Sequence, residues 1–154
     1  MIIICPEYWQ DICTHAEQTY PEECCGLLLG QIHQNSKIVV EVWSTPNSWD
    51  GNMAHSFSQI TGLAPRETNK QRSFTIAPRD MLKAQKYAAE HQLAIVGIYH
   101  SHPDYLAIPS EFDRAIAWQQ YSYIIISVRE GKATDGRSWV LNDEGQFEEE
   151  TITQ

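Results

Sequence analysis

The sequence predicts an α/β (α+β) domain in which a mixed central β-sheet is flanked by helices. Helical periodicity recurs in separate stretches, β-rich apolar runs lie between them, and no repeat or low-complexity linker divides the chain. The 154 residues suffice for one hydrophobic core but not for two ordinary domains. We therefore expect a single domain over residues 1–154.

The N-terminal part of the chain predicts a strand, a helix and a hairpin. A short edge strand at 1–4 precedes Pro6, a residue suited to the first helical turn. A helix is expected at about 6–19. Its apolar stripe is formed by Tyr8, Trp9, Ile12, Ala16 and Tyr20. Two β-rich stretches around a polar turn then predict a hairpin with strands at 24–32 and 38–45.

The rest of the chain continues this alternation. Residues 46–72 show no clear element apart from a short helix expected at 56–63. The apolar run 93–99 predicts a buried central strand. The other expected elements are a short strand at 73–76, a helix from Pro78 to about Gln92, a strand at 121–128, a turn at 131–136, a strand at 137–141, a turn at 142–145 and a last strand. The glutamates 148–150 are expected to form a solvated acidic face.

Composition and charge narrow the possible partners. Acidic residues outnumber basic ones by 20 to 11, for a formal net charge of −9 and a pI near 5.0. Phosphate binding depends on clustered Lys and Arg, so no nucleic acid partner is expected. No stretch approaches the length of a membrane span, and the N-terminus lacks the features of a secretory signal. We expect a cytoplasmic protein with no membrane partner.

Residues with the chemistry of a metal site follow the expected central strand. His100 and His102 continue the apolar run, and a side-chain period of two turns both imidazoles to one face. Pro103 stops further sheet pairing and opens a short loop. Ser110 then occupies the N-cap of a helix whose third position is Asp113.

This pattern has two interpretations. Ser-x-x-Asp before an apolar-periodic run is a capping box that any helix can use, and His-x-His on a strand is often a solvated pair. A strand, a tight loop and a helix start can also bring Asp113 back to His100 and His102 as a third ligand. Two imidazoles, one carboxylate and an open position for water form the general arrangement of a catalytic zinc site.

A candidate general base for such a site lies far upstream. Glu22 and Glu23 directly precede an apolar run in the stretch PEECCGLLLG. An acid at the beginning of a strand has a fixed backbone, as a base within hydrogen-bond reach of a water requires.

Together these residues resemble the signature of the JAMM (MPN+) metalloprotease family, in its small free-standing prokaryotic branch. The similarity spans roughly residues 21–128 and includes all five functional positions of that family. The pattern is Glu23-x-x-Gly26-x-Leu28-x-Gly30, followed by His100-x-His102-x7-Ser110-x-x-Asp113.

The resemblance implies an MPN/JAB domain fold, which is cytidine-deaminase-like, and zinc (Zn2+) as the cofactor. It implies zinc ligands at His100, His102 and Asp113. It also implies that Glu23, counted back from the glycine, is the acid/base that activates water. Ser110, by the same resemblance, steadies the tetrahedral intermediate.

The resemblance further implies the substrate class. Members of this branch cleave an amide or isopeptide bond at the C-terminus of a ubiquitin-like or sulfur-carrier protein with a Gly-Gly tail. The residues do not distinguish a cysteine adduct, an isopeptide conjugate and a short peptide, nor do they give the oligomeric state. A non-catalytic MPN-type scaffold is the alternative, but such scaffolds lack the ligands that this chain retains.

The four cysteines fit a reducing compartment, because their spacing matches neither a metal knuckle nor a disulfide framework. Cys5 and Cys13 are expected to pack as small apolar residues. Cys25 shares a face with Glu23 if residues 23–26 are strand, and could then lie near the metal. Packing is favoured over ligation, because the ligand set is complete without a thiolate.

The long connection 46–72 holds Trp49, Met53, His55 and Phe57 among polar residues. One interpretation is a surface loop that tucks its own aromatic side chains down. The other is a substrate-recognition flap, which the resemblance favours, because relatives that cut ubiquitin-like conjugates carry such insertions beside the active site. His55 is not expected to be a ligand, since the fourth metal position must stay open for water.

Overall fold

One mixed sheet organises the chain. The computed structural model describes residues 1–63 and 69–154, without the side chains of residues 51, 54, 55 and 57. The strands are β1 Ile2–Ile3, β2 Cys25–His33, β3 Ser36–Thr45, β4 Ala94–Pro103, β5 Ser122–Arg129, β6 Lys132–Leu141, β7 Phe147–Glu150 and β8 Ile152–Thr153. Over the described residues they pair in the order β7-β6-β5-β4-β2-β3-β1-β8. β4 and β5 are parallel, as is β1 to both β3 and β8, so the sheet is mixed as predicted.

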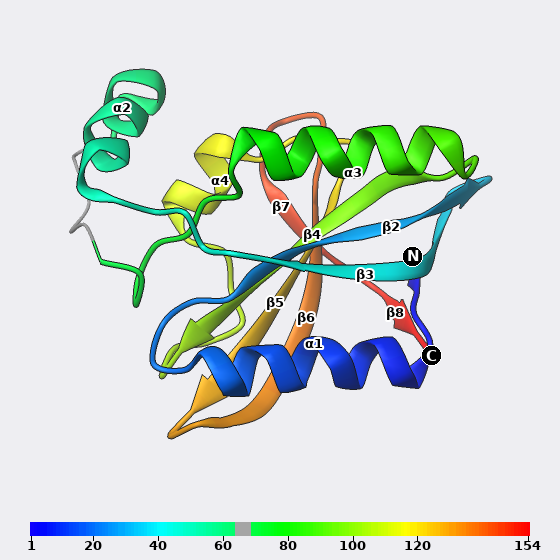
Figure 1. The fold of residues 1–154 in the computed structure, drawn as a ribbon, viewed down its shortest axis with the longest axis horizontal. Helices are drawn as coiled ribbons and strands as arrows, with labels where there is room; N and C mark the ends of the chain where they lie inside the picture. Colours follow the sequence, from blue (N-terminus) through cyan, green and yellow to red (C-terminus); the bar gives the residue numbers. More distant parts are fainter. Residues whose placement is uncertain (64–68) are drawn as a thin grey trace.

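Two long helices cover opposite faces of this sheet. They are α1, Pro6–Thr19, and α3, Pro78–Glu90. Figure 1 shows the sheet between them. Successive residues of β2 supply both cores: Leu28 packs with α1, whereas Leu27 and Leu29 pack with α3. The predicted helix at 6–19 is confirmed at both ends.

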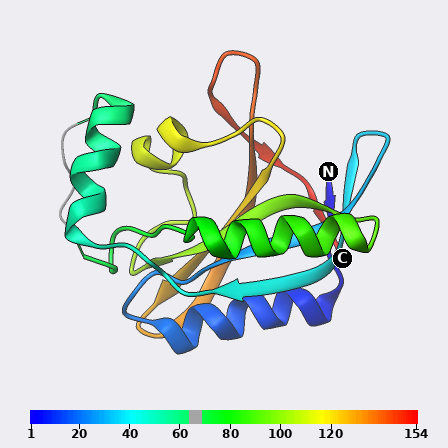
Figure 2. The ribbon, with the colours of Figure 1, turned by 45° about the horizontal axis from the view of Figure 1, so that its top comes forward.

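Two shorter helices, α2 Gly51–Thr61 and α4 Glu111–Ile116, lie beside each other near one end of α3 (Figure 2). Asp50 caps the beginning of α2, because its side chain accepts the backbone N–H groups of the second and third helical residues. Gly62 ends the helix in the left-handed region, at φ 73°. The helix is therefore longer and begins earlier than the predicted one at 56–63. None of the helices in the described ranges is long and apolar enough to span a membrane.

Other predicted elements were wrong in part. The segment 73–76 is not a strand, because it makes isolated hydrogen bonds to residues 47 and 48 instead of a ladder. The predicted turn at 131–136 belongs largely to β6, since Glu130 and Gly131 close a tighter hairpin with φ values of 49° and 82°. β1 is not an edge strand, because β8 pairs with its outer side.

The acidic run 148–150 is not entirely solvated. The side chain of Glu150 is 6% exposed and lies 3.2 Å from the amino group of Met1. It also accepts a hydrogen bond of 2.8 Å from Ser138 Oγ. This glutamate therefore fastens β7 to β6 and to the N-terminal residue.

Close packing explains Gly26, one of the glycines in the motif. A Cβ at this position would lie 2.2 Å from Tyr99 Cε1 and 2.4 Å from the carbonyl oxygen of Trp43. Tyr99 is 1% exposed, and its hydroxyl lies 2.8 Å from His15 Nδ1. The ring cannot move aside without disturbing that contact.

Gly26→Ala is expected to lower the free energy of unfolding by about 1–3 kcal/mol, the usual cost of overpacking a core. Urea unfolding of the variant and the wild type, followed by circular dichroism, measures the difference. An unchanged denaturation midpoint would contradict this account of the glycine.

Candidate metal centre

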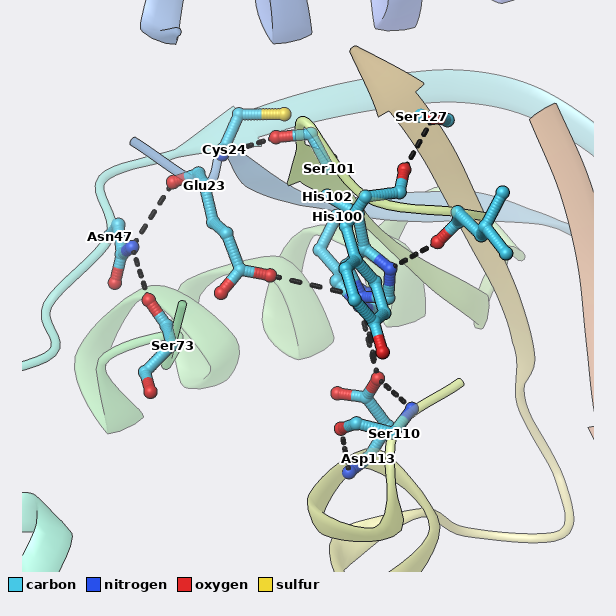
Figure 3. A network of polar contacts seen from close by, with 12 residues as sticks. Glu23, Cys24, Asn47, Ser73, His100, Ser101, His102, Ser110, Asp113 and Ser127 are labelled. Carbon is cyan, nitrogen blue, oxygen red and sulfur yellow. Dashed lines mark hydrogen bonds and ion pairs between the residues drawn. The ribbon is translucent and has the colours of Figure 1, made fainter. Parts of the chain in front are cut away.

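His100 and His102 lie at the buried end of β4, with 0% and 7% of their surfaces exposed. Alternate residues of a strand face the same side, so both rings enter one space. Their Nε2 atoms are 3.1 Å apart. Figure 3 shows the two imidazoles together, and the predicted shared face is confirmed.

A hydrogen bond on the far side of the His102 ring determines which of its nitrogens faces this space. Its Nδ1 lies 2.7 Å from the carbonyl oxygen of Leu106. A carbonyl can only accept a hydrogen bond, so Nδ1 carries a proton, and a neutral ring in this orientation presents the Nε2 lone pair to the shared space. This is the form of imidazole that binds a metal, with its other nitrogen hydrogen-bonded to the protein.

Stacking and strand pairing hold His100. The ring centroid lies 4.4 Å from that of Phe74, and the two planes differ by 21°. The residue is in register with Cys25 of β2 on one side and with Ile125 of β5 on the other. Strand pairing on both sides therefore fixes the backbone of His100, and Phe74 packs against one face of the imidazole.

Asp113 approaches the histidines from the beginning of α4. Ser110 Oγ accepts the Asp113 N–H at 3.0 Å, and Asp113 Oδ2 accepts the Ser110 N–H at 2.8 Å, so the predicted capping box is confirmed. The same Oδ2 lies 3.5 Å from His100 Nε2 and 3.6 Å from His102 Nε2. The two interpretations of the sequence are therefore compatible: one side chain caps the helix and faces the histidines.

The electrostatic surroundings keep Asp113 ionised. Burial by itself raises the pKa of this carboxyl, but the neighbouring His100 and His102 imidazoles outweigh burial and hold the pKa well below its usual range. A buried carboxylate is stable only beside compensating positive charge. The site therefore favours a cation.

The three facing atoms have the spacing of metal ligands. In a tetrahedral site with bonds of about 2.0–2.1 Å, neighbouring ligand atoms lie roughly 3.3–3.4 Å apart. The observed separations of 3.1, 3.5 and 3.6 Å bracket that value. His100, His102 and Asp113 thus outline one face of a tetrahedron, and the donor set fits a metal ion.

Glu23 reaches the same space from the chain just before β2 (Figure 3). Its Oε1 lies 3.9 Å from His102 Nε2. Ligand atoms of Glu23, His100 and His102 all lie within 4.8 Å of one another, so these three could also hold a metal. The 3.9 Å between Glu23 Oε1 and His102 Nε2 is longer than the 3.5 and 3.6 Å that separate Asp113 Oδ2 from the two imidazoles.

Hydrogen bonds outside the sheet hold the backbone of Glu23. Its N–H donates to the carbonyl of Lys70 at 2.7 Å, and its carbonyl accepts from Asn47 Nδ2 at 3.1 Å. The same amide group of Asn47 donates to the carbonyl of Ser73 at 3.0 Å. The strand predicted to begin at residue 24 begins one residue later, at Cys25, so Glu23 lies two residues before β2.

A cleft of about 100 Å³ opens onto the centre. It is lined by Glu23, Gln71, Arg72, His102, Pro103, Tyr105, Ser110 and Asp113. Ser110 Oγ uses a lone pair as the helix cap, so its hydroxyl hydrogen remains available to donate. The guanidinium of Arg72 lies 5.7 Å from the centroid of the Tyr105 ring and places a cation on the wall of the cleft.

Cys25 packs against the end of β3. Its Sγ lies 3.5 Å from Thr45 Oγ1. Burial raises the pKa of the Cys25 thiol to about 11, so the group stays protonated at neutral pH. The contacts of Cys25 Sγ with Thr45 and with the carbonyl oxygen of Pro46 support packing over ligation. Cys5 and Cys13, which were expected to be buried, are partly exposed.

The described part of 46–72 tucks one aromatic side chain inward, as the first interpretation predicts, and the substrate-recognition flap stays a prediction. Trp49 is 2% exposed and meets Phe112 edge to face, with centroids 5.6 Å apart. Gln71 and Arg72 border the cleft. The side chain of His55 lies outside the described residues, so the expectation that it is no ligand stays a prediction.

Sequence reasoning missed several residues that hold the centre. Asn47 looks like any polar turn residue in the sequence. Phe74 lies in a segment that was wrongly predicted to be a strand. Leu106 acts through its backbone carbonyl, which no sequence pattern distinguishes. Ser101 could have been found, because it lies between the two histidines on the strand. Its Oγ accepts the N–H of Cys24 at 2.8 Å and ties β4 to the segment that carries the glutamate.

Solved structures resemble the chain over nearly its whole length. The solution structure of a protein from Desulfitobacterium hafniense has a TM-score of 0.75 and 28% identity, and the match covers 99% of this chain and 91% of that one. A solution structure from Salinibacter ruber gives 0.68 and 28%, with coverage of 100% and 91%. The crystal structure of a JAB1/MPN domain protein from Archaeoglobus fulgidus shares the fold at 0.53 and 16%, with coverage of 99% and 98%. A search of curated proteins gave no match.

A family profile described as prokaryotic homologs of the JAB domain matches residues 6–142. The match extends from the first residue of α1 to the end of β6 and includes the strand and helix that carry the centre. The mixed sheet between helices and the likeness to a JAB1/MPN domain confirm the predicted fold. This chain belongs to the prokaryotic JAB domain family.

Proposed function

We propose that this chain is a zinc-dependent hydrolase that cleaves an amide or isopeptide bond. The observation that carries the proposal is the triangle of His100 Nε2, His102 Nε2 and Asp113 Oδ2, with Glu23 Oε1 at 3.9 Å from one corner. Two imidazoles and a carboxylate at tetrahedral spacing suit zinc, and three protein ligands leave the open position typical of catalytic sites.

A bound zinc ion supplies Lewis acidity, which activates water and polarises the scissile carbonyl. Glu23 takes the proton from the attacking water and passes it to the leaving amine, a role that its 4% exposure and braced backbone support. The hydroxyl of Ser110 donates to the substrate oxygen as negative charge develops there. Serving as a helix cap does not compete with this role, since the cap uses a lone pair of the same oxygen.

The proposed substrate is a ubiquitin-like or sulfur-carrier protein with a C-terminal Gly-Gly tail. A cleft of about 100 Å³ is small, which suits glycine residues because they have no side chain. An extended tail could continue along the chain at Gln71 and Arg72, on the wall of the cleft. A cytoplasmic location fits the free state of all four cysteines.

A non-catalytic scaffold is less well supported. Such a module needs no ionisable groups in its interior, whereas here Glu23 and Asp113 are 4% and 8% exposed beside two histidines. Burial of this kind costs free energy and is typical of functional sites. Hydrolysis of a carrier-protein conjugate, sensitive to a chelator, distinguishes the enzyme from the scaffold.

Protein purified from zinc-replete medium is expected to hold about one equivalent of zinc. His102→Ala and Asp113→Ala are expected to lose it, because each removes one corner of the triangle. His33→Ala, at the exposed end of β2, is the matched control and should keep the metal. Elemental analysis measures the content, and wild-type protein with less than about 0.1 equivalent would contradict the zinc site.

Glu23→Gln is expected to lower turnover by about 10²–10⁴-fold while zinc stays bound, because the amide cannot accept the proton. The exposed neighbour Glu22 provides the control Glu22→Gln, which should leave turnover unchanged. Mass spectrometry of a Gly-Gly carrier conjugate follows release of the leaving group. Turnover of the Glu23 variant within about tenfold of wild type would refute the assignment of the base.

Ser110→Ala is expected to lower kcat by about 10²–10³-fold, the usual effect of losing one donor to a developing oxyanion. It also removes the N-cap of α4, which is expected to lower the free energy of unfolding by about 1 kcal/mol. Ser110→Thr keeps both the hydroxyl and a capping oxygen, and should retain most activity. Equal losses in the two variants, with equal thermal stability, would exclude a donor role for the hydroxyl.

A further inference from the structure

The loop between β4 and α4, residues 104–109, connects the two histidines to Ser110 and Asp113. Three successive carbonyl groups of this loop each accept a hydrogen bond from a side chain on a different strand. The pairs are Ser127 Oγ of β5 with Tyr105, His102 Nδ1 of β4 with Leu106 at 2.7 Å, and Trp139 Nε1 of β6 with Ala107 at 3.0 Å. The loop is therefore held residue by residue.

The loop is also held where it leaves the sheet. The N–H of Asp104 donates to the carbonyl of Val128 at 2.6 Å. Its two carboxylate oxygens accept from the Tyr20 hydroxyl at 2.5 Å and from the Glu130 N–H at 2.9 Å. These bonds fix the first residue of the loop to the end of α1 and to the β5–β6 hairpin.

The carbonyl of Leu106 is the critical one, because it holds the proton of His102 on Nδ1 and thereby turns Nε2 toward the centre. The carbonyl belongs to a loop and is not part of a sheet ladder. Its direction depends on its two neighbours, whose own carbonyls are bound by Ser127 and Trp139. The donor residue Ser127 is 2% exposed and the acceptor residue Ala107 is 1% exposed, so water does not readily replace the hydrogen bond at either residue.

We propose that Trp139 and Ser127 are positioning residues for the metal centre: by fixing the carbonyls on either side of Leu106, they set the orientation of His102 and the distance to Asp113. Neither side chain is among those lining the cleft. Both side chains act through the loop. That the metal is zinc is taken from the proposed function, on which this inference rests.

Replacing Trp139 by phenylalanine removes the indole N–H together with one of the two fused rings. Trp139→Phe deletes the donor to Ala107 and keeps an aromatic ring on β6. The matched control is Trp43→Phe, because Trp43 Nε1 also donates a hydrogen bond of 3.0 Å, to Glu41 on β3, away from the loop. Both variants lose one indole hydrogen bond, and only the first loses it at the loop.

Zinc affinity, measured by competition with a chromophoric chelator, is expected to fall by about 10–100-fold in Trp139→Phe, the usual effect of losing an outer hydrogen bond of a metal site. The control should bind zinc as the wild type does, and thermal unfolding of both metal-free variants gives their stability. Co²⁺ in place of zinc adds a readout of ligand geometry, since its visible absorption changes when His102 or Asp113 shifts.

Ser127→Ala provides an independent arm if Trp139→Phe fails to fold. Its control is Ser138→Ala, which removes another buried serine hydrogen bond, from Ser138 Oγ to Glu150. Loss of zinc affinity and an altered Co²⁺ spectrum in Ser127→Ala, but not in Ser138→Ala, support the proposal.

The outcomes separate this inference from the proposed function. Wild-type affinity and an unchanged Co²⁺ spectrum in both loop variants would overturn the positioning role while the zinc enzyme stands. Absence of zinc binding in the wild type would instead remove the proposed function itself. Equal losses of zinc affinity in the loop variants and in their controls would show that the effect comes from lower overall stability. That result would also overturn the inference.

Discussion

Four ionisable side chains are buried together at one end of the sheet, where Glu23, His100, His102 and Asp113 are 4%, 0%, 7% and 8% exposed. Removing such groups from water costs several kcal/mol for each ion unless charge and hydrogen bonds compensate. Backbone groups of the β4–α4 loop and of α4 provide part of that compensation. Two imidazoles and two carboxylates are a donor set that could hold a metal ion, and a divalent cation there would supply the rest.

The sheet explains how residues from distant parts of the chain meet there. β4 pairs with β2 on one side and with β5 on the other, and Ser101 ties the end of β4 to the residue after Glu23. The parallel pairing with β5 needs a crossover, and the loop and α4 belong to that crossover. Asp113 on the helix therefore returns to the strand that carries the two histidines.

Local patterns in the sequence predicted what depends on local structure. The stripe of α1, the hairpin of β2 and β3, the shared face of the histidine pair and the capping box at Ser110 all follow from periodicity or from contacts within a few residues. The proximity of Glu23 to the histidines came from family resemblance, since no local pattern joins residues so far apart. The structure then supplied the distance of 3.9 Å.

Long-range contacts explain what the sequence could not predict. Three successive glutamates indicate a solvated face, and only the fold brings Glu150 to Ser138 and to the amino group of Met1. Asn47 has the appearance of a turn residue, yet it bridges the backbones of Glu23 and Ser73. Backbone carbonyls such as that of Leu106 leave no trace in a sequence at all.

The capping box has a thermodynamic consequence. α4 has six residues, fewer than an isolated helix needs for stability in water, so its first turn depends on Ser110 and Asp113. Because one carboxylate of that turn also faces His100 and His102, helix formation and ion binding at the proposed site are linked equilibria, and each stabilises the other by the same free energy. Ion affinity then includes the free energy of ordering this one turn. A substitution on the outer surface of α4 can therefore change how tightly the ion binds without touching any ligand.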